Sequence, residues 1–205
     1  MPGQVAPPHV LTPEDRSRSD LYALLARLYA DGPDRALLAS IAGAPRIDDS
    51  SELAVAWNRL ADASLAADCV MAMQEYTDLF VGVGKSEVNL HASFWLSGFT
   101  MERPLAQLRS ELAVLGLARR EGVSMLEDHL SALCESMRLL IAGDAERQPA
   151  TLAIQRVFFE RNLAPWVFDC CIAIGDSPIA NYYRGVAEWT RAFMTVEREA
   201  LAMDE

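Results

Sequence analysis

Hydrophobic residues recur along this chain at intervals of three and four positions, the spacing that lines up one face of an α-helix. The strongest pattern lies near the end of the sequence and predicts a long helix whose apolar face carries Ile179, Tyr182, Val186, Trp189, Phe193 and Val196. Leucine-rich patterns predict two more helices, over 105–115 and 126–140. No segment shows the alternation of period two that is typical of a half-buried β-strand. The pattern therefore predicts an all-α protein.

Polar residues with helix-capping side chains mark where several helices are expected to begin. Thr12 and Ser177 each precede a proline, so each is predicted to cap a helix whose first turn contains that proline. Ser124 and Glu127 have the spacing of a capping box, in which each side chain bonds the backbone amide of the other. A helix is therefore expected to open at 124, with Glu127 as part of its cap.

Glycine and proline clusters separate these helices without dividing the chain into repeats. Further helices are expected to end near 41 and to span 51–66, 67–81, 149–162 and 164–174, with a short one at 93–96 inside the irregular stretch 82–102. We predict roughly eight to ten helices in a single domain, 12–205, which follows a loose proline-rich tail, 1–11. The connection 116–124 is long enough to serve as a hinge, so both a monomer and a domain-swapped homodimer are compatible with the sequence.

Composition and charge narrow the class of partner. Apolar residues make up 51% of the 205 positions, enough to form a hydrophobic core. The net charge of −11 argues against nucleic acid as a partner, and it fits either a basic partner or simple solubility. The sequence has neither an apolar run of 18 residues nor the basic start of a secretory signal, so we expect a cytoplasmic protein without membrane insertion. The four cysteines form no C-x-x-C pair and are expected to be small core residues.

The residue patterns that catalysis or metal binding would need are missing from the sequence. None of the three histidines belongs to an H-E-x-x-H motif, and Leu126 stands where a di-iron helix would place a glutamate before His129. The run 82–84 lacks the third glycine of a dinucleotide loop, and Leu79 occupies the first glycine position of a phosphate-binding loop. We therefore expect a protein that is not an enzyme and has no cofactor.

One charged run, Glu127-Asp128-His129, has two interpretations. In the first, the acids complement the dipole of the expected helix beside a partly buried His129. In the second, the run is an acidic recognition point for a cationic peptide, where an arginine bonds a carboxylate through its planar fork. Asp128 is expected to point away from the leucine-rich face of the helix, which would leave it accessible to such a peptide.

Aromatic residues gather around the irregular stretch and provide the second candidate surface. They are Phe80, Phe94, Trp95 and Phe99. Most are expected to lie in the core, whereas a few on a mobile loop would form an apolar groove for a partner helix.

Three separated stretches of the chain carry a family resemblance. They are Glu75-Tyr76 with Leu79-Phe80-Val81-Gly82 and Ser93-Phe94-Trp95-Leu96; Glu127-Asp128-His129-Leu130 with Met137; and Leu163-Ala164-Pro165-Trp166 with Tyr182-Tyr183-Arg184. In this order and at this spacing they resemble the motifs of the TorD/DmsD family of molybdoenzyme maturation chaperones, of which NarJ is a more distant branch. Leu90-His91 and Asn162 stand where that family has Pro-Tyr (or Pro-Trp) and histidine.

The resemblance implies a chaperone that binds the twin-arginine signal peptide and the apo form of a molybdopterin-dependent oxidoreductase, assists cofactor insertion and holds back export. It implies that Asp128, with Glu75 or Asp78, contacts the two arginines, and that His129 beside Glu127 supports the loop and helix start. The apolar part of the peptide is expected to contact Ser93, Phe94, Trp95 and Leu96, with Phe80 nearby. A generic α-helical adaptor or regulator without such a client is the alternative.

Overall fold

The computed structural model describes residues 11–203, which form ten α-helices and one π-helical turn without a β-strand. In chain order they are α1 (Pro13–Ala30), α2 (Arg35–Ala42), α3 (Glu52–Ala66), α4 (Cys69–Tyr76), η1 (Thr77–Val81), α5 (Ala92–Ser97), α6 (Arg103–Val114), α7 (Leu130–Ala142), α8 (Leu152–Asn162), α9 (Val167–Asp176) and α10 (Tyr182–Ala202). The prediction of an all-α fold with eight to ten helices is confirmed. Residues 1–10 of the predicted tail lie outside the described residues, and the division at residue 12 stays a prediction.

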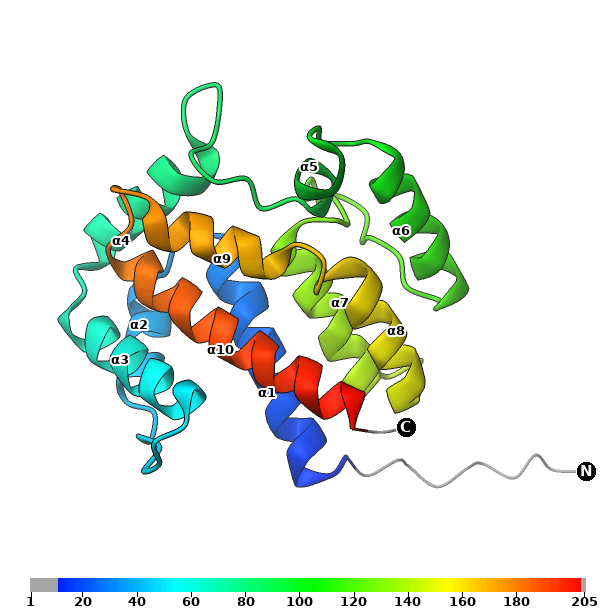
Figure 1. Ribbon diagram of the computed structural model, residues 1–205, viewed down its shortest axis with the longest axis horizontal. Coiled ribbons are helices and arrows are strands. Elements are labelled where there is room, and N and C mark those ends of the chain that lie inside the picture. Colours follow the sequence, from blue (N-terminus) through cyan, green and yellow to red (C-terminus); the bar gives the residue numbers. More distant parts are fainter. Residues whose placement is uncertain (1–10, 204–205) are drawn as a thin grey trace, which may run out of the picture.

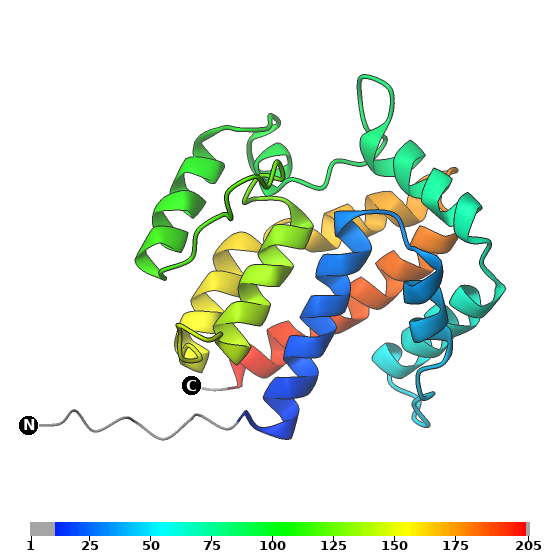
Figure 2. The ribbon, with the colours of Figure 1, turned by 180° about the vertical axis from the view of Figure 1, so that it is seen from behind.

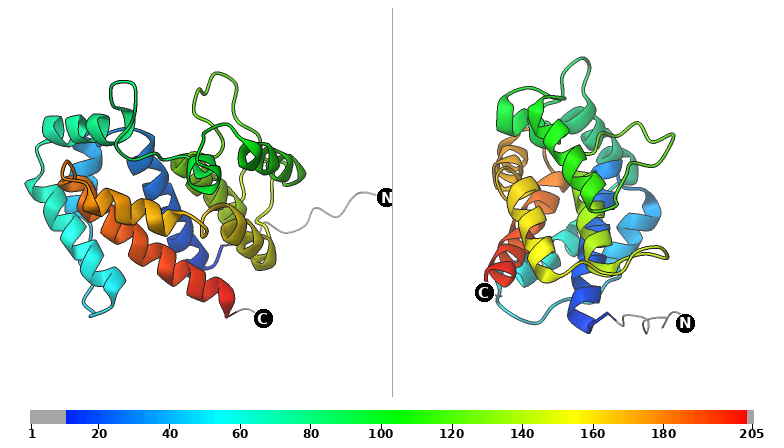
Figure 3. Two further views of the ribbon diagram at one scale, coloured as in Figure 1. Left: turned by 45° about the horizontal axis from the view of Figure 1, so that its top comes forward. Right: turned by 90° about the vertical axis from the view of Figure 1, so that its right-hand side faces the viewer.

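Helix α10 is the axis on which much of the fold packs. Helices α3, α4, α8 and α9 all contact it, and α9 lies along its length (Figure 1). Helix α1 packs most extensively against α7, and these two lie side by side in the view from behind (Figure 2). Helices α5 and α6 contact each other, and α6 lies at one edge of the molecule in the left view of Figure 3.

The core is filled by the apolar faces that the sequence pattern marks. Of the six residues predicted on one face of α10, four are at most 4% exposed, whereas Ile179 and Val196 are 39% and 45% exposed. Ile179 lies before the helix begins, so the helical spacing does not apply to it. Phe80 packs edge-on against Tyr183 and Tyr76, with ring centroids 5.0 and 5.3 Å apart. Three cysteines are buried and one is partly buried, as predicted.

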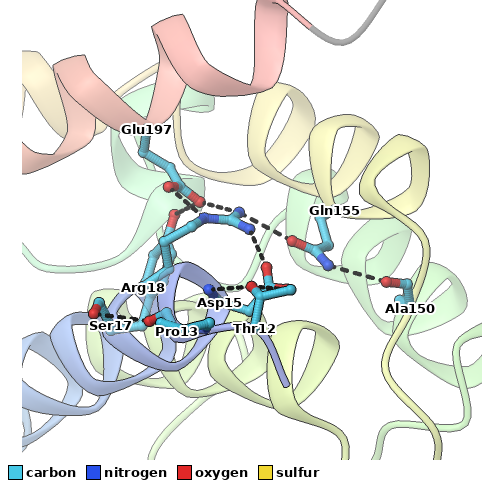
Figure 4. Close-up of polar contacts among 9 residues, drawn as sticks. Thr12, Pro13, Asp15, Ser17, Arg18, Ala150, Gln155 and Glu197 are labelled. Carbon is cyan, nitrogen blue, oxygen red and sulfur yellow. Dashed lines mark hydrogen bonds and ion pairs between the residues drawn. The ribbon is translucent and has the colours of Figure 1, made fainter. Parts of the chain in front are cut away.

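A buried ion pair joins the first helix to the last (Figure 4). The guanidinium of Arg18 in α1 donates from Nε and Nη2 to the carboxylate of Glu197 in α10, at 3.0 and 2.7 Å, and the Glu197 side chain is 2% exposed. Arg18 also donates to Gln155 of α8 at 3.0 Å, and the Tyr22 hydroxyl donates to Glu197 at 3.2 Å. Because removing one partner of such a pair leaves a buried charge uncompensated, the cluster fixes three helices relative to one another.

The start of α10 is capped by a side chain from a different helix. The Glu75 carboxylate of α4 accepts hydrogen bonds from the backbone N–H groups of Asn181, Tyr182 and Tyr183 at 2.8, 3.0 and 2.8 Å. The prediction that Ser177 caps this helix is therefore wrong, since α10 begins at Tyr182. A negative charge at this end also complements the helix dipole, and it comes from a residue about one hundred positions earlier in the chain.

The predicted capping box at Ser124 is also wrong. Helix α7 begins at Leu130, where His129 is the N-cap residue and its Nδ1 accepts from the Ser131 N–H at 3.2 Å. Helices α8 and α9 likewise begin at Leu152 and Val167, about three residues later than predicted. By contrast, the predicted cap of α1 is confirmed, because Thr12 accepts from the backbone N–H of Asp15. The local capping signal thus held for α1 and failed for α7, where His129 is the cap, and for α10, where a distant carboxylate is the cap.

The Glu75 cap yields a test of stability. Replacing Glu75 by alanine leaves three N–H groups at a buried helix start without their acceptor, and we expect the free energy of unfolding to fall by about 2–4 kcal/mol. Asp78→Ala is the matched control, because the exposed Asp78 carboxylate bonds only the Gln74 side chain. Urea denaturation followed by circular dichroism measures both. Equal midpoints for the two variants would show that the cap contributes nothing.

Candidate functional site

Two segments far apart in the sequence cross in front of α7 and build the candidate site. The Ala92 N–H donates to the Asp128 carbonyl at 2.9 Å, and the Leu130 N–H donates to the Leu90 carbonyl at 2.8 Å. These bonds form an isolated antiparallel bridge between His91 and His129. The crossing sets the position of α5, which begins immediately after the bridge, relative to the start of α7.

Asp128 lies inside this crossing and not on the surface. Its side chain is buried, and its Oδ2 accepts from the Ser93 N–H at 3.1 Å and from the Ser93 hydroxyl at 2.5 Å. The expectation that Asp128 points outward is therefore wrong, because α7 begins two residues after it and the helical face on which that expectation depended does not exist here. Its other oxygen, Oδ1, is buried without a hydrogen-bond partner among residues 11–203. Buried carboxylate oxygens normally have donors, so this atom could accept one more.

The two histidine rings of the crossing lie edge to face, with centroids 5.0 Å apart. His129 is 8% exposed, and its Nδ1 accepts from a backbone N–H, which fixes the proton on the other ring nitrogen. Burial, together with the neighbouring His91, lowers the pKa of His129 to about 3. Burial also lowers the pKa of His91, although the Asp128 charge opposes that shift. Both rings are therefore neutral near pH 7.

The carboxylate of Glu127 holds two arginines of its own chain. Arg109 of α6 donates from Nε and Nη2 to Oε2 at 3.0 and 2.9 Å, and Nε of Arg119 lies 3.6 Å from Oε1. Burial raises the pKa of Glu127, but the Arg109 hydrogen bond and the two positive charges outweigh it and the pKa is lowered. Sequence reasoning missed both arginines. Their separations from Glu127, 18 and 8 positions, match no helical contact and gave no signal.

A groove of about 310 Å³ lies beside the crossing, between the segment 85–89, α5 and α9. It is lined by Lys85, Ser86, Glu87, Val88, Asn89, Phe94, Trp95, Gly98, Phe99, Thr100 and Ala173. The indole N–H of Trp95 donates to the Asn89 carbonyl at 2.8 Å, which fixes the ring against the groove wall. Gly82 shapes the loop that brings Lys85 to the rim: its φ is 62°, and a Cβ there would collide with the Lys85 carbonyl.

The structure divides the predicted site residues into two groups. Ser93, Phe94, Trp95, Leu96, Glu127, Asp128 and His129 lie at the crossing or on the helix that it positions. The other three lie on α4 and the π turn: the carboxylate of Glu75 caps α10, Phe80 packs in an aromatic cluster, and Asp78 is exposed. The expected contacts of all ten with a peptide stay predictions. Within 11–203, no three metal-ligating side chains gather, and no helix has the length and apolar character to cross a bilayer.

The class of protein follows from an all-α domain whose crossing lies within the residues matched by one family model. The family model described as "Nitrate reductase delta subunit" matches residues 47–172, more than half of the chain. The chain therefore belongs to this family, the TorD-like chaperones, and the resemblance identified from the three sequence stretches is confirmed.

Comparison with solved structures agrees on the fold. A crystal structure of a candidate redox enzyme maturation protein from Archaeoglobus fulgidus aligns with a TM-score of 0.54 over 97% of this chain and 99% of that chain, at 13% sequence identity. At this identity the likeness establishes a shared fold. No curated protein sequence matches the chain significantly.

The neutral histidines generate a pH prediction. Between pH 6.5 and 5 the unfolded chain takes up a proton on His129 that the folded protein excludes. The contribution of the neutral His129 to the free energy of unfolding is therefore full above pH 6.5 and is lost as the pH is lowered. With a folded pKa of about 3, the loss attributable to His129 by pH 5 is about 2 kcal/mol. Urea denaturation at pH 7, 6 and 5 measures it, and His129→Gln should flatten the curve. A His129 ring that titrates by NMR near pH 6.5 in the folded protein would contradict the burial argument.

Proposed function

We propose that this protein is a cytoplasmic maturation chaperone that binds the twin-arginine leader and the apo form of a molybdopterin-dependent oxidoreductase. One observation carries the proposal: α5 lies between two neighbouring carboxylates and an apolar groove. Ser93 at its start bonds Asp128, beside Glu127, and the next two residues, Phe94 and Trp95, line the groove. A leader with two arginines followed by an apolar stretch presents the complementary order of charge and hydrophobicity.

Apolar burial should supply most of the affinity. Exposed ion pairs contribute about 0–1 kcal/mol each, whereas buried apolar surface contributes about 25 cal/mol per Å². A groove of about 310 Å³ is at the small end of ligand sites, so it accommodates a few side chains and not a whole leader helix. Phe99 lines the groove and is 70% exposed, and Leu96, which is 44% exposed, extends the apolar surface beyond the groove. The net charge of −11 steers a cationic leader toward the protein and does so less as salt increases.

The geometry favours Glu127 over Asp128 as the first contact for an arginine. Glu127 is partly buried beneath two exposed guanidinium groups, while Asp128 is enclosed behind Ser93. Asp128 then acts by holding α5 in place, and its Oδ1 becomes available only if the crossing opens. Glu75 has three backbone donors already, so we leave it out of the contact set. These roles involve binding and not turnover, and the molybdenum cofactor would belong to the client.

We expect the apolar rim to control leader affinity. Leu96→Ser and Phe99→Ser should each raise the Kd of a synthetic twin-arginine leader, taken from a molybdoenzyme of the same organism, by about fivefold to tenfold. Leu65→Ser is the matched control, because Leu65 is 74% exposed on α3 and does not line the groove. Titration calorimetry measures binding, and circular dichroism checks that the three variants remain folded.

The outcomes separate this function from a generic adaptor. Equal Kd values for Leu96→Ser, Phe99→Ser and Leu65→Ser would place the leader elsewhere on the molecule. If the wild-type protein binds no twin-arginine leader, and affinity capture from the native host recovers no molybdoenzyme, the adaptor alternative is favoured.

A further inference from the structure

The acidic side of the proposed site is already occupied by the chain itself. The Glu127 side chain is 13% exposed because Arg109 and Arg119 cover it, yet these arginines are 47% and 38% exposed. Arg109 directs two of its N–H groups to one carboxylate oxygen, and Arg119 approaches the other oxygen while donating to the Met125 carbonyl at 3.4 Å. The arrangement is a carboxylate between two guanidinium groups, the same pair of groups that a twin-arginine leader would present.

The two arginines belong to a part of the fold that few other elements contact. Arg109 is on α6, whose main packing partner is the short α5, and Arg119 is in the connection that follows α6. Leu105, Leu108 and Leu112 of α6 are buried, and one side-chain bond, from Asn162 of α8 to Glu111 at 3.0 Å, also holds the helix. In the connection, Leu117 is buried and the Gly116 carbonyl accepts from Arg147. Exposed guanidinium groups on such a segment can leave the carboxylate without unfolding the α1–α7 or α9–α10 packing.

We propose that Arg109 and Arg119 are an internal competitor for the leader's arginine pair, an autoinhibitory contact that closes α6 and 115–124 over Glu127 until a leader replaces it. The inference rests on the proposed function, since it names the groups that the leader must displace. It assigns a role to two residues outside the predicted contact set. Binding is then an exchange of one guanidinium pair for another, and the net gain comes from the apolar stretch that enters the groove.

The exchange also explains why arginine would be required in place of lysine. A guanidinium presents a planar fork that matches a carboxylate, whereas an ammonium is a compact, strongly hydrated point charge. A lysine pair therefore competes poorly against the resident arginines. We expect a leader with Lys-Lys in place of Arg-Arg to bind the wild-type protein more weakly than the Arg-Arg leader, and the difference to shrink when the internal pair is removed.

The test measures leader binding to full-length variants by fluorescence anisotropy. Arg109→Ala and Arg119→Ala should each lower the Kd of the Arg-Arg leader by about twofold to fivefold, and Arg109→Lys should do the same although it keeps the charge. Arg120→Ala is the matched control, because it removes a neighbouring positive charge that makes no ion pair with Glu127. Glu127→Gln should weaken binding, and adding Arg109→Ala to it should change nothing further.

Hydrogen exchange of the free protein tests the closure without any leader. Residues 115–127 should exchange faster in Arg109→Ala/Arg119→Ala than in the wild type, while α1 and α10 stay equally protected. If exchange is unchanged, or if only variants that remove charge bind the leader more tightly, the internal competitor is ruled out and the leader site stands. If no variant binds the leader but exchange increases as expected, the proposed function fails and the closure remains.

Discussion

A buried carboxylate joins helix α10 to another helix near each of its two ends, and the rest of the fold depends on these two contacts. At its start, Glu75 from α4 accepts the three N–H groups that a buried helix end leaves without partners. Near its other end, its own Glu197 holds Arg18 of α1 through two bonds. Because a helix end or a charge that loses its partner inside the protein is costly, these contacts fix α1, α4 and α10 as one frame. The crossing at His91 and His129 is built on that frame.

The frame and the proposed binding surface differ in how firmly they are attached. The frame has buried charged bonds and a continuous aromatic core. In contrast, α5 and α6 are joined to the rest of the fold by one backbone bridge, the Ser93–Asp128 pair, the buried leucines of α6, the Asn162–Glu111 bond and exposed arginines. Segments attached by few buried contacts open at low free-energy cost, and ligand-binding regions are drawn from such segments. The proposed function, which is to bind a client and later release it, needs this division between a stable body and an adjustable edge.

Sequence reasoning predicted the helices well and their beginnings unevenly. Hydrophobic spacing is a local property, so the apolar faces of α7 and α10 followed from it directly. The starts of these two helices did not, because His129 and Glu75 satisfy the backbone there, and Glu75 lies about one hundred residues from the amides that it caps. The same limit applied to Asp128: it was expected outside on the assumption of a helix from 124, and the bridge to Ala92 placed it inside. Family motifs contained residues of α5 and residues 127–130 but did not indicate that the two segments cross. Arg109 and Arg119, which no motif contains, emerged only from the packing of α6.

Lys85 at the groove rim is the only lysine in the chain. An amine-reactive reagent therefore has one side chain to modify, besides the α-amino group, and that side chain lies beside the aromatic wall of Phe94 and Trp95. A dye or photoreactive group attached there would report on this surface without any engineered cysteine. The four native thiols, three of them buried, can accordingly be left in place.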